Sequence, residues 1–328
     1  METISLEPVD AVHITTLVDN QIDVLMPDQP PAKRWGPIGT AGRMNAVPSE
    51  VFLGGKTADQ PRAEHGYSAL IEVIDGTRRR RVLFDTGVSP NGLVENLDRL
   101  GISPETFEAI VLSHGHLDHV AGMDGLGRRL GPRSLPVFLH PEFWTRRRLA
   151  FPGGSFELPQ PSRAAIQGLG FEVVEGARPS FLLDGSLLIT GEVDRTTEFE
   201  KGMPIHQAWR GEDWEPDPLI LDDQAVIAHV RDKGLVVLTG CGHAGIVNIV
   251  RYAKRLTGVE RIHAVMGGFH LTGGLFEKVI PVTVSALAAE TPSVVVPAHC
   301  TGWKAQQALA ATMTDAYVWN SVGTRFEL

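Results

Sequence analysis

The sequence has few cysteines, no excess of basic charge and no long apolar run. Its two cysteines, Cys241 and Cys300, are too few for a disulfide framework, and each lies close to a histidine. This placement favours reduced thiols beside a metal site, although a single bridge between the two stays open. The formal net charge of −9 over 328 residues argues against nucleic acid as the main partner, because phosphate contacts need a basic surface.

The absence of long apolar runs also affects what we expect for the cellular location of the protein and its domain organisation. No stretch is long enough to cross a bilayer, and the start, Met1-Glu2-Thr3-Ile4, lacks the basic residues and apolar segment of a signal peptide. We therefore expect a cytoplasmic protein with no membrane partner. A hydrophobic content of 43% allows a sizeable core. We expect one domain over 1–328, with surface excursions at about 26–63 and 151–218, where Pro and Gly interrupt any sustained period.

The most informative stretch follows a short apolar run at 109–112. It places three histidines and a carboxylate within six positions, His114, His116, Asp118 and His119. Neutral imidazoles and a carboxylate suit a divalent ion such as zinc, and the intervening glycine allows a tight loop. The spacing suggests two ions, one held by the first two histidines and the other by the Asp-His pair.

Three further apolar strands are expected to end at histidines. They lie in the segments 234–243, which contains Cys241 and His243, 262–270, which ends at His270, and 294–302, which contains His299. Such a repeat predicts one sheet edge that carries ligands. Cys241 is interpreted either as a ligand or as a buried core thiol. Another strand ends at Asp85, which we expect to orient a ligating histidine or to cap a turn.

The remaining pattern predicts a scaffold of strands and helices. A hairpin is expected around Asp75-Gly76. A helix with Leu93, Leu97 and Leu100 on one face is expected to stop at Gly101, and another is expected over 246–256, whose start could offer amide donors to an anion. Near the end we expect a helix over 304–313 and a strand over 317–319. The Arg146–Arg148 run is expected to be solvated.

The loop His114-x-His116-x-Asp118-His119 resembles the signature of the metallo-β-lactamase superfamily. The chain is further similar to the branch of metal-dependent hydrolases that includes the archaeal dihydropterin-ribofuranosyl-aminobenzene-phosphate synthase. The segments that carry this likeness are 17–20, 64–66, 83–87, 113–119, 191–192, 222–224, 239–245, 267–271 and 299–302.

The resemblance implies an α/β fold, a four-layer αβ/βα sandwich with the metal site at one edge between two mixed sheets. It places Asp85 at the strand end and makes His299 the final histidine ligand. Two positions depart from the family pattern. The third-motif histidine is absent around 221–223, and Cys241 stands where an aspartate usually bridges the metals. Either His243 supplies the missing imidazole, or the site is asymmetric and binds one ion tightly.

These residues predict a hydrolase that uses a metal-activated hydroxide on a small anionic or phosphorylated ester. Asp118 would hold the second ion and position the hydroxide, while His65 or His270 would stabilise negative charge on the substrate. Asn20 and Thr301 are expected to contact the substrate.

The cofactor is expected to be one or two divalent ions, zinc first, with iron or manganese open. Two alternatives remain: a condensing enzyme like the synthase, and a non-catalytic metal-binding or redox-sensing scaffold. The oligomeric state is not predicted.

Overall fold

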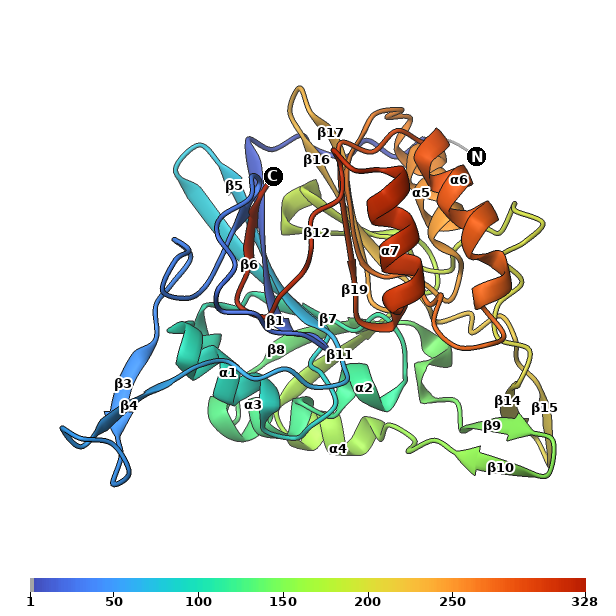
Figure 1. The fold of residues 1–328 in the computed structure, drawn as a ribbon. Helices are drawn as coiled ribbons and strands as arrows, with labels where there is room; N and C mark the ends of the chain where they lie inside the picture. The colour runs from blue at the N-terminus through green and yellow to red at the C-terminus, as the bar shows by residue number, and fades with distance from the viewer. Residues whose placement is uncertain (1–2) are drawn as a thin grey trace.

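Two large β-sheets dominate the structure, a computed structural model that describes residues 3–328 (Figure 1). The strands of the first sheet are β1 (Ala11–Val18), β2 (Ala32–Lys33), β5 (Ser68–Asp75), β6 (Arg78–Phe84), β7 (Ala109–Val111), β8 (Leu135–Leu139), β11 (Phe171–Glu175) and β20 (Arg325–Glu327). Their order is β11-β8-β7-β6-β5-β1-β20-β2. The four strands from β11 to β6 run parallel, and the others pair antiparallel, so the sheet is mixed.

The second sheet has six strands and is also mixed. Its strands are β12 (Ser180–Leu182), β13 (Leu187–Ile189), β16 (Ala225–Val230), β17 (Gly234–Thr239), β18 (Ile262–Gly268) and β19 (Val294–Ala298), paired in that order. The last three are parallel neighbours. Parallel strands end at the same edge, so the three predicted strand-to-histidine turns do lie side by side.

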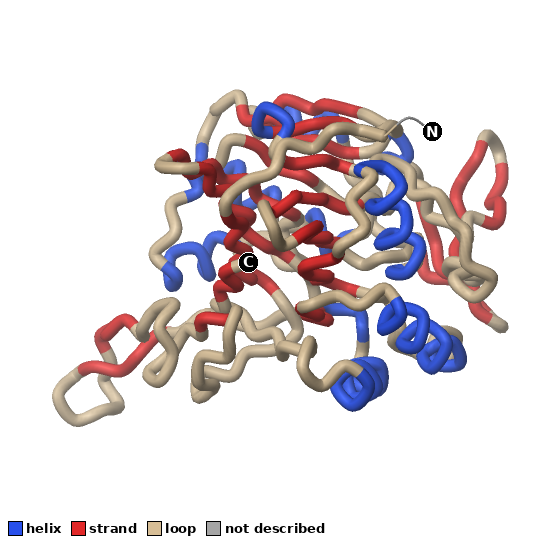
Figure 2. Tube along the Cα trace, turned by 90° about the horizontal axis from the view of Figure 1, so that it is seen from above, coloured by secondary structure: helices blue, strands red, loops and turns tan. Residues whose placement is uncertain are grey.

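Helices cover the outer face of each sheet, which completes four layers (Figure 1, and from above in Figure 2). The helices are α1 (Gly92–Leu100), α2 (Leu117–Val120), α3 (Met123–Leu130), α4 (Arg163–Gly168), α5 (Ile246–Thr257), α6 (Ile280–Ala289) and α7 (Trp303–Thr312). The first sheet packs on α1, α3 and α4, and the second on α5, α6 and α7. None of the helices within 3–328 is both long and apolar enough to span a membrane.

Alternation along the strands explains why both faces of each sheet are buried. In β17, Leu235 and Val237 pack against the helices, while Val236 and Leu238 pack against the first sheet. Successive side chains point to opposite faces of a sheet, so a continuous apolar run fills two interfaces at once. The expected α/β sandwich is thereby confirmed.

Two smaller sheets project from this sandwich. One is the hairpin of β3 (Asn45–Pro48) and β4 (Lys56–Asp59), which lies within the expected excursion at 26–63. The other has the order β10-β9-β14-β15, from β9 (Arg147–Phe151), β10 (Gly154–Glu157), β14 (His206–Arg210) and β15 (Asp213–Pro216). Figure 2 shows both away from the central layers. The expected excursion at 151–218 is more than surface, because it also supplies β11, β12 and β13 to the two main sheets.

Two expectations about the ends of elements differ in outcome. Helix α1 stops where predicted, at Gly101, whose φ of 69° is left-handed. The strand predicted over 317–319 is wrong: Tyr317 makes only an isolated bridge to Val295. The terminal strand is instead β20, which crosses to the first sheet and pairs with β1. Three residues at a chain end carry too little pattern to identify such a strand.

Candidate metal centre

The loop after β7 carries His114 and His116, and the short helix α2 that follows carries Asp118 and His119, at one edge of the sandwich. His114 and His119 are fully buried and His116 is 8% exposed, whereas the carboxylate of Asp118 is partly open to solvent. Nε2 of His114 lies 3.0 Å from Nδ1 of His116. The strand therefore delivers these side chains inward, as the sequence predicts.

Donor atoms from both sheets converge on this loop. Three groups of side chains each bring their donor atoms within 4.8 Å of one another, and Cys241 belongs to all three. The groups are Asp118, His119, Cys241 and His299; His114, Cys241 and His243; and Cys241, His270 and Cys300. His243 thus lies where the sequence analysis expects the missing imidazole. Both cysteines are free thiols.

Asp85 fixes the protons on two of the rings. Its Oδ1 accepts from Ser113 N and its Oδ2 from Ser113 Oγ, both at 2.7 Å, and Oδ2 lies 2.7 Å from His119 Nδ1. An ionised carboxylate only accepts, so His119 donates from Nδ1. The Ser113 hydroxyl donates its one hydrogen bond to Asp85, so its oxygen accepts a hydrogen bond from His114 Nδ1 at 2.9 Å. The neutral rings therefore turn the lone pairs of Nε2 toward the cluster.

This arrangement requires a close approach of two strand ends. A Cβ on Gly240, at the end of β17, would lie 2.1 Å from Ser113 Oγ and 2.6 Å from Asp85 Oδ2. Only glycine lets the second sheet reach the carboxylate that orients the first. The Thr-Gly-Cys turn is therefore explained by contact with Asp85 and Ser113.

Hydrogen bonds with Asn20 and Asp19 fix the orientation of His299. Its Nδ1 lies 3.2 Å from Asn20 Oδ1, and the Asn20 amide donates to the carbonyl of His299 at 3.2 Å. Asp19 Oδ1 accepts from the backbone N–H of His299 at 2.7 Å. Nε2 is left facing Asp118 Oδ2 at 3.1 Å. Asn20 therefore orients His299, and its side chain is engaged there rather than free for a substrate.

Backbone strain gathers at the same place. Asp85, His270 and His299 have φ values of 54°, 42° and 45°, in the left-handed region that non-glycine residues rarely adopt. Such strain costs about 1–3 kcal/mol per residue and persists where the surroundings enforce it. Asp85 and His299 stand directly after a strand and His270 stands two residues after one, so the strain accompanies the site.

Burial keeps several rings neutral. Burial and neighbouring imidazoles lower the pKa of His114, His116 and His243. Neutral imidazole is the form that binds a metal ion. Burial also raises the pKa of the Cys241 thiol, whose Sγ lies 3.1 Å from Nε2 of His119. A nearby cation would stabilise the thiolate.

In the group formed by Asp118, His119 and His299, neighbouring charges outweigh burial in setting the pKa values. Burial by itself would lower the pKa of His119, but the carboxylates of Asp85 and Asp118 raise it to about 9. Burial by itself would raise the pKa of Asp118, but the imidazoles of His119 and His299 hold it below its usual range. Without a cation this half therefore pairs an imidazolium with a carboxylate, and a bound ion would displace the proton.

The donor set fits one or more divalent ions. Lone pairs of buried nitrogens that face each other at about 3 Å repel unless a cation or proton lies between them. Nε2 of His243, 5% exposed, has no hydrogen-bond partner among residues 3–328. Buried polar atoms are nearly always paired, so this orphan supports a ligand role. Imidazole, carboxylate and thiolate together favour zinc over harder ions.

The rim of the cluster is formed by His65 and His270. The His65 side chain is 67% exposed, with Nε2 3.7 Å from Asp118 Oδ2. The ring of His270 stacks 4.2 Å from His243 and 4.7 Å from Phe276. Both imidazoles therefore lie at the edge of the cluster.

A cavity opens beside His243 and His270. Its apolar walls come from Phe199, Phe269, Leu271, Phe276 and Val279. Thr283, on α6, also lines it and is 1% exposed, yet Oγ1 has no hydrogen-bond partner within the described chain. The cavity thus combines ring faces with one unused hydroxyl.

Two predictions near this cavity need correction. Thr301 does not face a substrate: it is fully buried, donates to the Ala298 carbonyl at 2.7 Å and accepts from Phe269 N at 3.1 Å. The start of α5 is not free for an external anion, because the carboxylate of Glu200 accepts from Val247 N and Asn248 N at 2.9 Å. An internal carboxylate already complements that helix end.

The sequence analysis missed two residues that contact the site. His206, on β14, lies with Nε2 3.0 Å from His116 Nε2 and is fully buried. Arg147, expected to be solvated, is 2% exposed and forms a bidentate pair with Asp222 at 2.9 and 2.5 Å. Alternation in β9 was the available signal, since it turns Arg147 away from the exposed Arg146 and Arg148.

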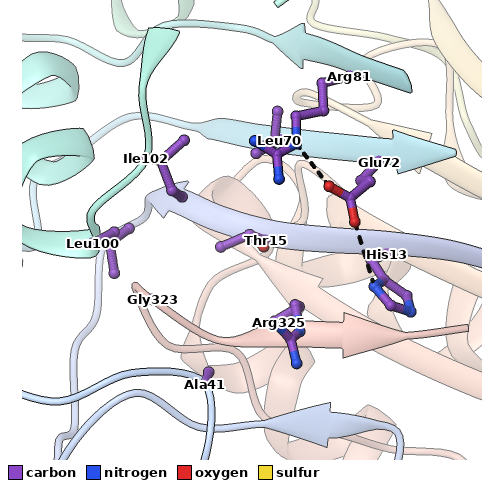
Figure 3. Close-up of a pocket in the computed structure, with 10 residues that line it drawn as sticks. All are labelled: His13, Thr15, Ala41, Leu70, Glu72, Arg81, Leu100, Ile102, Gly323 and Arg325. Carbon is purple, nitrogen blue, oxygen red and sulfur yellow. Dashed lines mark hydrogen bonds and ion pairs between the residues drawn. The ribbon is translucent and has the colours of Figure 1, made fainter. Parts of the chain in front are cut away.

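A different cavity, on the first sheet, is lined by none of these residues. Figure 3 shows Glu72 within it, 2.7 Å from Arg81 and 3.9 Å from His13, while Arg325 pairs with Glu327 outside the view. Its carboxylates and arginines are therefore neutralised by one another.

The chain belongs to the metallo-β-lactamase superfamily, whose family model matches residues 62–256. It is 31% identical over 251 residues to the 7,8-dihydropterin-6-methyl-4-(β-D-ribofuranosyl)-aminobenzene-5'-phosphate synthase of Methanocaldococcus jannaschii, covering 74% of this chain and 83% of the relative. An uncharacterized protein of the same archaeon is 32% identical over 268 residues, covering 80% and 92%.

A solved structure has the same fold. The crystal structure of Tm1679, a metal-dependent hydrolase of the β-lactamase superfamily, matches with a TM-score of 0.69 at 22% identity. The match covers 97% of this chain and 99% of the other. This confirms the expected fold and family resemblance, while the reaction of this chain has to be argued from its site.

Proposed function

We propose that this protein is a metal-dependent hydrolase that cleaves a small, anionic or phosphorylated ester at the histidine cluster. The observation that carries the proposal is the convergence of buried donors. Asp85, Ser113 and Asn20 bind the outer nitrogens of their histidines and so turn the remaining lone pairs toward one space. Such orientation of ligating histidines by hydrogen bonds is typical of metal centres.

Two adjacent ions fit the residues. Cys241 belongs to all three groups of donors and would be a further ligand. His114, His116 and His243 would hold the first ion, and Asp118, His119 and His299 the second. Zinc is the ion that this donor set favours. A divalent cation there would supply Lewis acidity and an ionised water at neutral pH.

The chain's own residues provide the rest of the mechanism. Asp118 is partly exposed, and its Oδ2 lies 3.7 Å from His65 Nε2 and 3.1 Å from His299 Nε2, so its carboxylate can accept a hydrogen bond that orients the attacking water. His65 and His270 can donate hydrogen bonds to charge that develops on the substrate. The small cavity beside His243 would contact an apolar edge of the substrate, with Thr283 Oγ1 as an available hydrogen-bonding group.

A synthase-like condensation is the second candidate. The named relative supports it, and so does a cavity walled by ring faces, since aromatic side chains pack well on flat rings. In this reaction the same cluster would stabilise a departing pyrophosphate. The two functions share the metal and differ in the nucleophile, which is water in the hydrolase and the amino nitrogen of the aminobenzene in the synthase.

One set of incubations separates these functions. Zinc-loaded protein is assayed with p-nitrophenyl phosphate, bis(p-nitrophenyl) phosphate, p-nitrophenyl acetate and an acyl lactone. It is also assayed with the dihydropterin pyrophosphate and aminobenzene ribosyl phosphate pair. Product from the ester panel supports the hydrolase, and pyrophosphate release only with the complete pair supports the synthase.

The control variants tie activity to the cluster. His114→Ala should lose zinc and turnover together, whereas His229→Ala, on β16, should keep both. Full turnover in chelated protein would overturn the metal-dependent reading of either function. Zinc binding without turnover on any substrate, together with zinc loss on mild oxidation of Cys241 or Cys300, would favour the redox-sensing scaffold.

A further inference from the structure

His206 is buried, and the polar atoms around its ring determine which ring nitrogen carries the proton. Its Nδ1 lies 3.0 Å from the Asp217 carbonyl oxygen and 3.3 Å from Asp217 Oδ2. The carbonyl oxygen can only accept in this hydrogen bond, and the carboxylate oxygen nearby is also an acceptor, so Nδ1 must carry a proton. In the neutral ring Nε2 is then an acceptor. It lies 3.0 Å from Nε2 of His116.

The tautomer of His206 in turn determines the tautomer of His116. To complete the contact, His116 must donate from Nε2, which leaves a lone pair on its Nδ1. That nitrogen is the one 3.0 Å from Nε2 of His114, where the first ion is proposed to bind. We propose that His206 is a positioning residue that holds His116 in the tautomer able to bind this ion. The inference rests on the metal centre of the proposed function.

A buried chain of polar contacts fixes His206 itself. Asp217 Oδ2 lies 3.5 Å from Nε of Arg147, and the two outer nitrogens of Arg147 bind Asp222. Asp222 Oδ2 in turn accepts from the backbone N–H of Gly115 at 2.8 Å. Starting from His116, the contacts thus return to the residue before it. All four side chains in this circuit are at least nine-tenths buried.

The circuit gives the small projecting sheet a role in the site. Arg147 belongs to β9 and His206 to β14, paired strands of that sheet. The loop end of the circuit is equally constrained, because a Cβ on Gly115 would lie 2.3 Å from the Phe143 carbonyl oxygen. The strands therefore clamp the motif loop on both its backbone and its second histidine.

Two substitutions at this position separate positioning from simple filling of space. His206→Phe keeps a ring of similar volume but offers no acceptor to His116. His206→Gln has a side-chain carbonyl that can accept at the same place. His263→Phe, on β18, is the matched control, since it changes the same residue type on a strand outside the cluster.

The main readout is zinc affinity, measured by competition with a chromophoric chelator. Loss of a hydrogen-bond partner to a metal-ligating histidine typically weakens metal binding by about 10–100-fold. We expect His206→Phe to show a loss of this size, with wild-type affinity largely restored in His206→Gln and unchanged in His263→Phe. Long-range ¹H–¹⁵N NMR of zinc-loaded wild type should place protons on Nε2 of His116 and Nδ1 of His206.

Either of two results would overturn the inference. One is equal zinc affinity in His206→Phe and wild type, or equal loss in the Phe and Gln variants while both remain folded by circular dichroism. The other is a proton on Nδ1 of His116 in the NMR spectra, which decides the matter even where the Phe variant does not fold. None of these readouts requires turnover, so an inactive protein with the expected affinities would overturn the proposed hydrolase and leave the role of His206 intact.

Discussion

Replacing Asp85 by asparagine should weaken zinc binding most strongly at the half of the metal centre that contains His119, which Asp85 contacts directly. The carboxylate is fully buried and accepts from Ser113 N, Ser113 Oγ and His119 Nδ1, each at 2.7 Å. An amide of the same shape has one accepting oxygen and one donating nitrogen. Whichever way it turns, at least one of these donors meets another donor.

Both orientations have a measurable cost. If the amide nitrogen faces His119, the ring must move its proton to Nε2, the nitrogen that faces Cys241. Zinc affinity at that position should then fall by about 10–100-fold. If the nitrogen faces the backbone of Ser113 instead, a buried N–H loses its acceptor, at about 1–3 kcal/mol of folding free energy. We expect the first outcome because it leaves the backbone contact intact.

The assay is metal content after equilibration with a zinc buffer, combined with urea unfolding. Wild type should retain two equivalents of zinc and Asp85→Asn about one, whereas Asp75→Asn, at a hairpin turn, should behave as wild type. Two equivalents bound at wild-type affinity by a fully stable Asp85→Asn protein would refute the reasoning.

Three further predictions concern groups around the cluster. Burial raises the pKa of Asp223 from 3.8 to about 6. The pKa in the folded state lies above that in the unfolded state, so the wild type loses stability as pH rises from about 4 to about 6. By pH 7, Asp223→Asn should gain about 3 kcal/mol of unfolding free energy relative to wild type, as measured by urea unfolding. A difference that does not change with pH would contradict this. Thr283→Val should raise KM about 5–10-fold with little change in kcat and no loss of melting temperature, because the hydroxyl has no partner within residues 3–328; clear destabilisation would reveal a structural role. Arg147→Met should cost about 3–5 kcal/mol and Asp222→Asn a similar amount, with the double variant losing less than the two together; additive losses would argue against a coupled pair.

The sequence was sufficient to predict the parts that depend on local pattern. The parallel strands β17, β18 and β19 are continuous apolar runs, and each ends in a small-residue turn followed by His243, His270 or His299. Because parallel strands end at one edge, their histidines must gather there. The motif loop follows β7 in the same way.

The parts that depend on distant pairing were out of reach. His206 is 90 residues from its partner His116 and lies in a segment without a sustained apolar period. Its burial results from the folding of β9 and β14 against the motif loop. The prediction for Thr301 rested on its place beside a candidate ligand in the sequence. In the structure its hydroxyl is hydrogen-bonded to the backbone of its own turn and of Phe269.

Anomalous scattering from crystals of the zinc-loaded protein tests the central claim most directly. Two zinc peaks about 3.5–4 Å apart are expected, on either side of Cys241 Sγ. His114, His116 and His243 should surround one, and Asp118, His119 and His299 the other. A zinc-saturated crystal with no peak inside the cluster, or with zinc bound only elsewhere, would contradict the account.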